Sequence, residues 1–306
     1  MKKIGIAQGR IEASEIGLGC MRMADLEKNQ AEKVIKTALE EGINFFDHAD
    51  IYGKGKSEEI FAEAINMNSN IREKMIIQTK CSIVPGVMYD YSKEHIISSV
   101  EGSLKRLKTD YVDTLLLHRP DTLMEPEEVC EAFLKLNESG KVREFGVSNH
   151  NSMQIELLNK YLKNKIVINQ MQFGIMHTGM IDSGLNVNMT NEPSINRDGS
   201  ILEYCRLKDI TIQAWSPYQY GFFEGVFLDN PKFPELNRVI NEIAEEKGVS
   251  NTSIATAWIL RHPAKIQTIV GTMNNERLKD ICTASNVEIS REDWYKIYLA
   301  AGNKLP

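Results

Sequence analysis

Short apolar runs alternate with longer helical patterns eight times along this chain of 306 residues. The runs are rich in β-branched and aliphatic residues, and the longer segments repeat apolar residues every three to four positions. The predicted strands are Ile16–Gly19, Gly42–Asp47, Met75–Lys80, Tyr111–His118, Val142–Ser148, Ile166–Met171, Ile210–Trp215 and Ile266–Gly271. The predicted helices are Gln30–Glu41, Ser57–Asn66, Lys93–Leu107, Glu127–Glu138, Met153–Tyr161, Ile201–Leu207, Leu236–Lys247 and Glu276–Ala284. Eight β/α units in order, in about this length, predict a single-domain (β/α)8 TIM barrel over residues 1–306.

A doubly wound sheet is the alternative fold for alternating strands and helices. Its dinucleotide-binding fingerprint needs three glycines after the first strand, and the one candidate, Gly17–Arg22, has arginine at the third position. The barrel is therefore favoured. An N-terminal β-hairpin and two extra helices, Asn251–Arg261 and Arg291–Ala301, are expected beside it. Phe173–Gly199 is expected to be an ordered or closing loop.

Polar and aromatic residues stand at the ends of the predicted strands. In a (β/α)8 barrel these C-terminal ends, and the loops that follow them, carry the catalytic groups. The residues concerned are Asp47, Lys80, His118, Ser148, Asn149, Gln170, Trp215 and Ser216, and Tyr52 follows Asp47 by five positions. Closure of a barrel would bring all of them to one mouth.

Asp47, Tyr52, Lys80 and His118 together suggest a proton donor. Each alone has an ordinary structural explanation, as a cap, a packed ring, a rim charge or a core histidine. Tyrosine has an unperturbed pKa of about 10, and a nearby ammonium favours the phenolate. A carboxylate beside the lysine would keep that ammonium charged and oriented. The set predicts general-acid catalysis at an oxygen that becomes negative, as in reduction of a carbonyl.

Composition excludes several other functions. A formal net charge of −6 argues against a nucleic-acid partner, and no segment reaches the roughly 18 apolar residues needed to span a membrane. The start of the chain lacks a signal-peptide apolar core, and five scattered cysteines without CxxC pairing are typical of a reducing, cytoplasmic setting. No His or carboxylate pair has metal-ligand spacing, so no metal is expected. Nothing in the sequence predicts an oligomeric state.

Several motifs in order resemble the aldo-keto reductase family, most of all its bacterial YdhF-like branch, and the resemblance covers nearly the whole chain. They are Gly17–Met21, Gly42–Gly53 with "DHADIYG", the Lys80 strand, "SLKRLKTDYVDTLLLHRPD" (Ser103–Asp121), "GKVREFGVSN" (Gly140–Asn149), Asn169-Gln170, Trp215–Pro217 and "IVGTMNNERL" (Ile269–Leu278). The resemblance implies a barrel enzyme that uses NADPH to reduce the carbonyl of a small-molecule aldehyde or ketone.

The same resemblance assigns roles to individual residues. Tyr52 would be the proton donor, Asp47 and Lys80 would tune it, and His118 would orient the carbonyl. Ser148, Asn149 and Gln170 would bind the nicotinamide carboxamide. Trp215, where many relatives have tyrosine, would stack on the nicotinamide ring, with Ser216 beside it. Met21 and Arg22 would flank the reactive end of the cofactor.

The last β/α unit carries the expected cofactor preference. Gly271 and Thr272 lead into a helix N-terminus, which suits an anion. Arg277 matches the family's arginine for the adenosine 2′-phosphate, and Thr272 matches a hydroxyl donor. Many relatives have lysine where this chain has Gly271, so one cation is missing. NADP(H) is still expected over NAD(H).

Two other functions are compatible with a barrel of this kind. One is a nucleotide-sensing binding protein with little turnover, against which the complete set of four residues argues. The other is a Schiff-base enzyme with Lys80 as nucleophile.

His48 and Asp50 are expected to serve the scaffold. Specificity is expected from Phe173–Gly199, the C-terminal segment and the aromatic loop Tyr218–Phe227, whose rings would form an apolar pocket, a lid or core packing.

Overall fold

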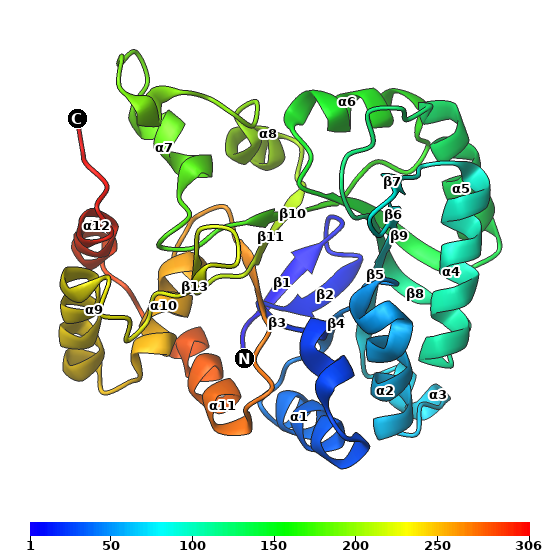
Figure 1. The fold of residues 1–306 in the computed structure, drawn as a ribbon, viewed down its shortest axis with the longest axis horizontal. Coiled ribbons are helices and arrows are strands. Elements are labelled where there is room, and N and C mark those ends of the chain that lie inside the picture. Colours follow the sequence, from blue (N-terminus) through cyan, green and yellow to red (C-terminus); the bar gives the residue numbers. More distant parts are fainter.

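The computed structural model describes all 306 residues and contains a closed barrel of eight parallel strands (Figure 1). The strands, in order around the barrel, are β3 (Ile16–Gly19), β4 (Phe45–Asp47), β5 (Ile76–Cys81), β8 (Val112–Leu117), β9 (Val142–Ser148), β10 (Ile168–Gln172), β11 (Thr211–Trp215) and β14 (Gln267–Val270). Neighbours in space are neighbours in this order, and β14 pairs with β3 to close the ring. The predicted (β/α)8 fold is confirmed, and all eight predicted strands are present.

Helices surround the barrel (Figure 1). Those of the β/α units are α1 (Lys28–Glu40), α2 (Lys56–Ala64), α4 (Lys93–Leu107), α5 (Pro126–Glu138), α6 (Ser152–Tyr161), α8 (Ile201–Leu207), α10 (Asn251–Leu260) and α11 (Asn275–Thr283). The others are α3 (Ser69–Arg72), α7 (Gly179–Leu185), α9 (Pro234–Lys247) and α12 (Arg291–Ala300). None of these helices has the length and apolar character needed to cross a membrane.

The structure corrects which helices are extra. The prediction paired Leu236–Lys247 with the seventh strand and set Asn251–Arg261 aside. In the structure α10 packs against β14, and its residues Ser253–Ile259 are all buried. Helix α9 instead packs on α10 and α12, at the outside of the molecule (Figure 1). The two extra helices are therefore α9 and α12.

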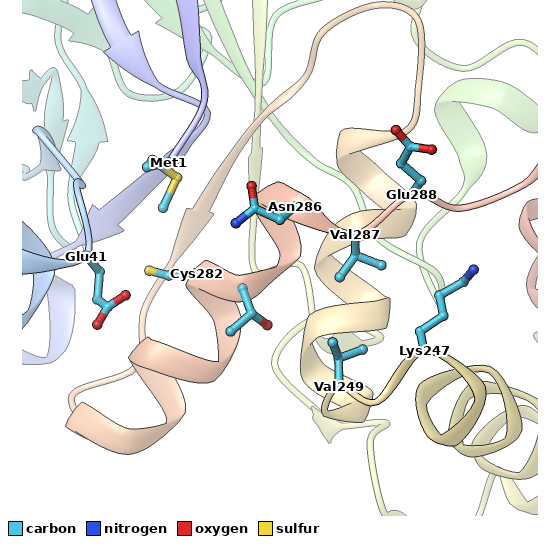
Figure 2. A pocket seen from close by; sticks show the side chains of 9 residues that line it. Met1, Glu41, Lys247, Val249, Cys282, Asn286, Val287 and Glu288 are labelled. Carbon is cyan, nitrogen blue, oxygen red and sulfur yellow. The ribbon is translucent and has the colours of Figure 1, made fainter.

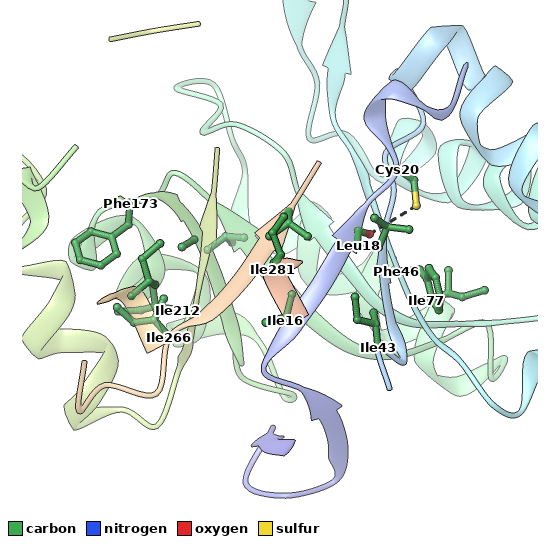
Figure 3. Close-up of a cluster of buried hydrophobic side chains, with 14 of the residues drawn as sticks. Ile16, Leu18, Cys20, Ile43, Phe46, Ile77, Phe173, Ile212, Ile266 and Ile281 are labelled. Carbon is green, nitrogen blue, oxygen red and sulfur yellow. Dashed lines mark hydrogen bonds between the residues drawn. The ribbon is translucent and has the colours of Figure 1, made fainter. Parts of the chain in front are cut away.

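Side chains of the barrel strands alternate between two faces, as strand geometry requires. Ile16, Leu18, Phe46, Ile77 and Ile212 belong to the main apolar core, between the barrel and the helices (Figure 3). Inward positions hold a smaller apolar cluster and, above it, polar groups. Gly17 is needed inside, because a Cβ there would lie 2.9 Å from Ile269 Cδ1 and 3.1 Å from Phe45 Cδ1.

The predicted N-terminal hairpin is present and closes the floor of the barrel. Strands β1 (Lys3–Ile6) and β2 (Ile11–Ser14) pair antiparallel. Their Ile6 and Ile11 side chains join the inner apolar cluster with Phe45, Leu116 and Ile168. The N-terminal ends of the strands are thereby covered, so the opposite, C-terminal ends form the open mouth.

Loops at the mouth contain more structure than the sequence predicted. Phe173–Gly199 includes α7 and the short 3₁₀ helix η3 (Glu192–Ser194). The aromatic loop forms a small hairpin, β12 (Gln219–Tyr220) and β13 (Gly225–Val226), and a second hairpin, β6 (Ile83–Val84) and β7 (Met88–Tyr89), follows β5. The remaining 3₁₀ helices are η1 (Met21–Asp25), η2 (Tyr52–Gly55) and η4 (Ala284–Asn286).

Candidate active site

A cavity of about 810 Å³ lies at the C-terminal ends of the barrel strands. Every residue predicted for the site lines it, except Lys80, which is fully buried beneath. The lining members are Met21, Arg22, Asp47, Tyr52, His118, Ser148, Asn149, Gln170, Trp215, Ser216, Gly271, Thr272 and Arg277. Residues from seven separate β/α units thus meet in one place.

Lys80 is the centre of a hydrogen-bonded group at the bottom of the cavity. Its Nζ donates to Asp47 Oδ2 at 2.7 Å, to the His48 carbonyl at 2.9 Å and to Tyr52 Oη at 3.1 Å. An ammonium has three hydrogens, so all are used. Tyr52 Oη accepts from Lys80, which leaves the phenolic hydrogen free to be donated elsewhere.

Charge on Lys80 is favoured in spite of its burial. Burial alone would lower the pKa of Lys80, but Asp47 and then Tyr52 outweigh it, so the pKa is raised. A charged, fully hydrogen-bonded amine has no lone pair for attack on a carbonyl. This arrangement argues against a Schiff-base mechanism through Lys80.

The pKa of Tyr52 is shifted in the direction opposite to that expected from Lys80 alone. Burial raises the pKa of Tyr52 more than the Lys80 ammonium lowers it, and Asp47 adds to the rise. Tyr52 is therefore a neutral phenol well above physiological pH, with its proton in place. The Lys80 ammonium, 3.1 Å from Tyr52 Oη, could stabilise a phenolate at this position.

His118 faces Tyr52 across the cavity with its ring edge-on, 5.9 Å between ring centroids. Burial, followed by the charges of Lys80 and Arg119, lowers the pKa of His118 well below its usual value, so the imidazole is neutral. Nδ1 is buried without a partner, and a buried N–H would be costly there. Nε2 is thus the nitrogen that carries the proton and can donate it to a carbonyl oxygen.

His48 and Asp50 lie outside the cavity lining. His48 is fully buried against Phe61, 4.5 Å between ring centroids, and both ring nitrogens lack a partner. Burial lowers the pKa of His48 to about 3. For Asp50, burial and then the nearby Glu58 raise the pKa to about 6. Their positions are those of scaffold residues behind the strand end.

The nicotinamide-binding candidates form a bonded set of their own. Trp215 Nε1 donates to Asn149 Oδ1 at 3.1 Å, and Asn149 Nδ2 donates to Ser148 Oγ at 2.8 Å. Ser148 Oγ donates to the Gln170 carbonyl at 3.0 Å. Asn149 has a φ of 60°, in the left-handed region that asparagine tolerates. These bonds present the face of the partly exposed Trp215 indole to the cavity.

A positively charged arm extends from the mouth towards α11. Asn274 caps this helix by accepting from the Arg277 backbone N–H at 2.9 Å, and Arg277 and Thr272 line the cavity. Arg22 Nη1 donates to the Gly271 carbonyl at 3.1 Å. The Arg22 guanidinium therefore lies beside Gly271.

The aromatic loop is divided between core and mouth. Tyr218 is bonded to Thr256 at 2.7 Å, and Phe227 is fully buried, so both anchor the hairpin. Phe222 and Phe223 are 67% and 48% exposed and line the cavity. Phe223 stacks on Trp215 with 6.0 Å between centroids. The hairpin is both core packing at its base and an apolar wall at its tip.

Sequence reasoning missed three residues of this region. Arg119 lines the cavity, with its guanidinium 5.8 Å from the centroid of the Trp215 ring. Gln78 and Gln213 are fully buried below Asp47. For the two glutamines, period-two spacing could have indicated an inward side chain, because Gln78 shares a strand face with Lys80 and Gln213 shares one with Trp215.

A second cavity, of about 640 Å³, lies away from this site, near the N-terminus and the ends of α9 and α11 (Figure 2). Met1, Glu41, Lys247 and Cys282 are among its lining residues. Burial raises the pKa of the Cys282 thiol to about 12, so it is not a nucleophile at neutral pH. None of the residues predicted for the site lines this second cavity.

A parallel barrel with Asp, Tyr, Lys and His at its mouth defines the class of protein, and comparison with known proteins identifies the family. The aldo/keto reductase family model matches residues 15–299. The chain is 33% identical to a 6-dehydroglucose reductase of Agrobacterium fabrum, with 99% of each chain covered. It is 32% identical to the oxidoreductase YdhF of Escherichia coli, with 98% of each covered.

A solved structure agrees with these sequence matches. A thermostable aldo-keto reductase, solved with the inhibitor epalrestat, superposes with a TM-score of 0.78 at 26% identity, covering 98% of this chain and all of the other. The chain belongs to the aldo/keto reductase family. It is an NAD(P)H-dependent oxidoreductase of that family, and its similarity to YdhF confirms the expected branch.

Proposed function

We propose that this protein reduces the carbonyl group of a small molecule with NADPH, and that Tyr52 donates the proton. One observation carries the proposal: Lys80 uses its three hydrogens on Asp47, the His48 carbonyl and Tyr52 Oη. The phenolic hydrogen is left free on a residue that lines the cavity.

Bound NADPH would supply a hydride to the carbonyl carbon. The Tyr52 proton then passes to the carbonyl oxygen, so that the carbonyl becomes an alcohol and Tyr52 becomes a phenolate. Lys80 already donates to Tyr52 Oη and stabilises that phenolate. His118, neutral and edge-on to Tyr52, donates an N–H to the same oxygen and orients it.

The residues at the mouth fit such a cofactor. Trp215 offers an aromatic face, while Ser148, Asn149 and Gln170 offer hydrogen-bonding groups for a carboxamide. Met21 and Ser216 lie at the same end. Arg277, Thr272, the start of α11 and the Gly271 backbone suit a phosphate, and Arg22 adds a cation near Gly271. Arg277, at the start of this helix, favours NADP(H) over NAD(H).

The test is turnover of a carbonyl panel by the purified protein, followed as loss of NADPH absorbance. The panel should include aliphatic and aromatic aldehydes and ketones, oxidised sugars and carbonyl compounds that bear a carboxylate. The name of the 33% identical relative is the reason for the sugars, and the cationic Arg119 is the reason for the acids. We expect turnover of at least one class, faster with NADPH than with NADH.

The contrary result is tight NADPH binding without turnover of any carbonyl. It would favour a nucleotide-sensing protein of this fold, in which cofactor binding alters the protein itself and no substrate is converted. The affinity for NADPH, measured by fluorescence in the same preparation, separates this outcome from a protein that has simply lost its cofactor site.

A further inference from the structure

Glutamine side chains fill the barrel interior directly beneath Asp47. Gln78 and Gln213 are fully buried, and neither lines the cavity. Gln170, from β10, lies between them and the mouth and lines the cavity. Buried amides need hydrogen-bond partners, because a polar group without one in the interior loses its bonds to water and gains nothing in return.

Two amide nitrogens each bridge the same pair of oxygen atoms. Gln78 Nε2 donates to Asp47 Oδ1 at 2.6 Å and to Gln213 Oε1 at 2.8 Å. Gln170 Nε2 donates to the same two oxygens, at 3.2 Å and 3.0 Å. The four groups close a hydrogen-bonded ring, which we call the amide ring: Asp47, Gln78, Gln170 and Gln213.

The amide ring fixes the orientation of its members. A carboxylate only accepts, and each amide nitrogen has two hydrogens, both of which are used here. Turning over Gln78 or Gln170 would place an oxygen against Asp47 and lose two bonds. Gln170 must therefore present its Oε1, an acceptor, to a ligand in the cavity.

Further bonds tie the amide ring to the surrounding barrel. Thr114 Oγ1 donates to Gln78 Oε1 at 3.0 Å. Gln213 Nε2 donates to Gln267 Oε1 at 2.8 Å, and Gln267 Nε2 donates to the Ser14 carbonyl at 2.7 Å. A continuous chain of bonds runs from the N-terminal hairpin to the carboxylate that holds Lys80.

We propose that Gln78 and Gln213 are positioning residues that couple the proton-donating side of the active site to the cofactor-binding side, an inference that rests on the proposed carbonyl reduction. Gln213 Oε1 holds the amides of Gln78 and Gln170 together. Gln78 makes the shortest bond to Asp47 in the ring, opposite the bond from Lys80 to the other oxygen. Neither glutamine would touch substrate or cofactor.

Substitution by methionine, which is unbranched and of similar size, removes each amide with little change in volume. Gln213→Met takes one bond from Gln170, so both kcat and the affinity for NADPH should fall, each by about 10-fold or more. Gln78→Met leaves both bonds of Gln170 intact. It should lower kcat by a similar factor, change the pH profile of kcat/KM and leave the NADPH affinity within about 3-fold.

Gln267→Met is the matched control. Gln267 is also fully buried and belongs to the same chain of bonds, but it lies one residue beyond the amide ring. Its substitution should lower the melting temperature as much as the others and keep kcat and NADPH affinity within about 3-fold of wild type.

Equal losses of kcat in all three variants, in proportion to their loss of melting temperature, would overturn the proposal. NADPH affinity is measured by fluorescence without turnover. If the wild type reduces no carbonyl, a weaker affinity in Gln213→Met than in Gln267→Met still supports the ring, and equal affinities still refute it. Gln78→Met gives an independent reading if Gln213→Met does not fold.

Discussion

At the scale of single residues, the site depends on how many hydrogens each group has to offer. Lys80 has three and uses three, so Tyr52 can only accept from it. The sequence predicted this group of residues, but it did not predict the pKa of Tyr52. An ammonium at hydrogen-bond distance lowers that pKa, but burial raises it more. The balance depends on how deeply the ring sits, which a sequence does not show.

Removal of the Lys80 ammonium should abolish turnover and destabilise the protein. Lys80→Met leaves the Asp47 carboxylate buried without its cation, at a cost of about 3–5 kcal/mol in unfolding free energy. The phenolate of Tyr52 would also lose its partner, and kcat should fall at least about 100-fold. Denaturant unfolding and NADPH oxidation measure the two effects.

The double variant Asp47→Asn, Lys80→Met is the control for this prediction. It removes both charges, so it should recover much of the lost stability while turnover stays low. Recovery of turnover together with stability would mean that Lys80 serves folding alone.

Arg277 should set the preference between the two nicotinamide cofactors. Arg277→Ala removes an exposed guanidinium that lines the positively charged arm of the cavity. The Kd for NADPH should rise about 10-fold, and that for NADH should stay nearly the same, because only NADPH has the 2′-phosphate. Lys279→Ala, on the same helix but outside the cavity lining, is the charge-matched control and should change neither. An equal loss for both cofactors would place Arg277 elsewhere on the ligand.

At the scale of elements, the sequence predicted the strands well and ranked two helices wrongly. Strand ends were readable because apolar runs stop at a polar residue, as at Asp47 or Lys80. Helix α9 has the periodicity of a helix buried on one face, whereas α10 is apolar and buried on nearly all sides. A helix that is apolar all round belongs against the barrel, and this signal was available in Ile254–Ile259.

Two substitutions in the β12–β13 hairpin should separate its contribution to stability from its contribution to ligand binding. Phe227→Ala removes a fully buried ring at its base and should cost about 3–5 kcal/mol of unfolding free energy. Phe223→Ala removes a half-exposed ring that stacks on Trp215 and should cost less than about 1 kcal/mol. Thermal or denaturant unfolding gives both values.

Ligand binding should respond to the two substitutions in the opposite order, with the larger effect in Phe223→Ala. Phe223→Ala should raise the KM for substrate or the Kd for NADPH, because it opens the apolar wall of the cavity. Loss of binding in Phe227→Ala at a temperature where it is folded, without any in Phe223→Ala, would contradict the assignment of the hairpin tip to the site.

At the scale of the whole molecule, the barrel brings distant segments together at one mouth, and the eight β/α units were enough to predict this. The contacts among side chains in the interior below the mouth could not be predicted from the sequence. Gln78, Gln170 and Gln213 come from three strands, and no local pattern shows that their side chains meet. Their contacts depend on the register around the barrel, as in the pairings of Asp47 with Gln78 and of Gln170 with Gln213.

Neutral buried histidines should make the fold sensitive to acid. Burial lowers the pKa of His48 to about 3, below the roughly 6.5 of an unfolded chain. Its contribution to stability is therefore complete above about pH 6.5 and is lost as the pH falls towards 3. Between pH 7 and pH 5, His48 alone should account for about 2 kcal/mol of lost unfolding free energy.

His48→Leu should remove that part of the acid sensitivity, since both ring nitrogens lack partners and no bond is lost. Urea unfolding at pH 7 and pH 5 gives the difference for each protein. An unchanged pH dependence in His48→Leu would contradict this account, because it would show that the pKa of His48 is the same in the folded and the unfolded protein.

The central claim is that Tyr52 supplies the proton for carbonyl reduction, and the most direct test compares Tyr52→Phe with wild type in a single turnover. Enzyme is loaded with NADPH, mixed with a substrate from the panel and followed by stopped-flow fluorescence. The phenylalanine ring keeps the packing at the mouth, so the Kd for NADPH should stay within about 2-fold. Loss of the acid should slow reduction at least about 100-fold. Reduction by Tyr52→Phe at the wild-type rate would contradict the account.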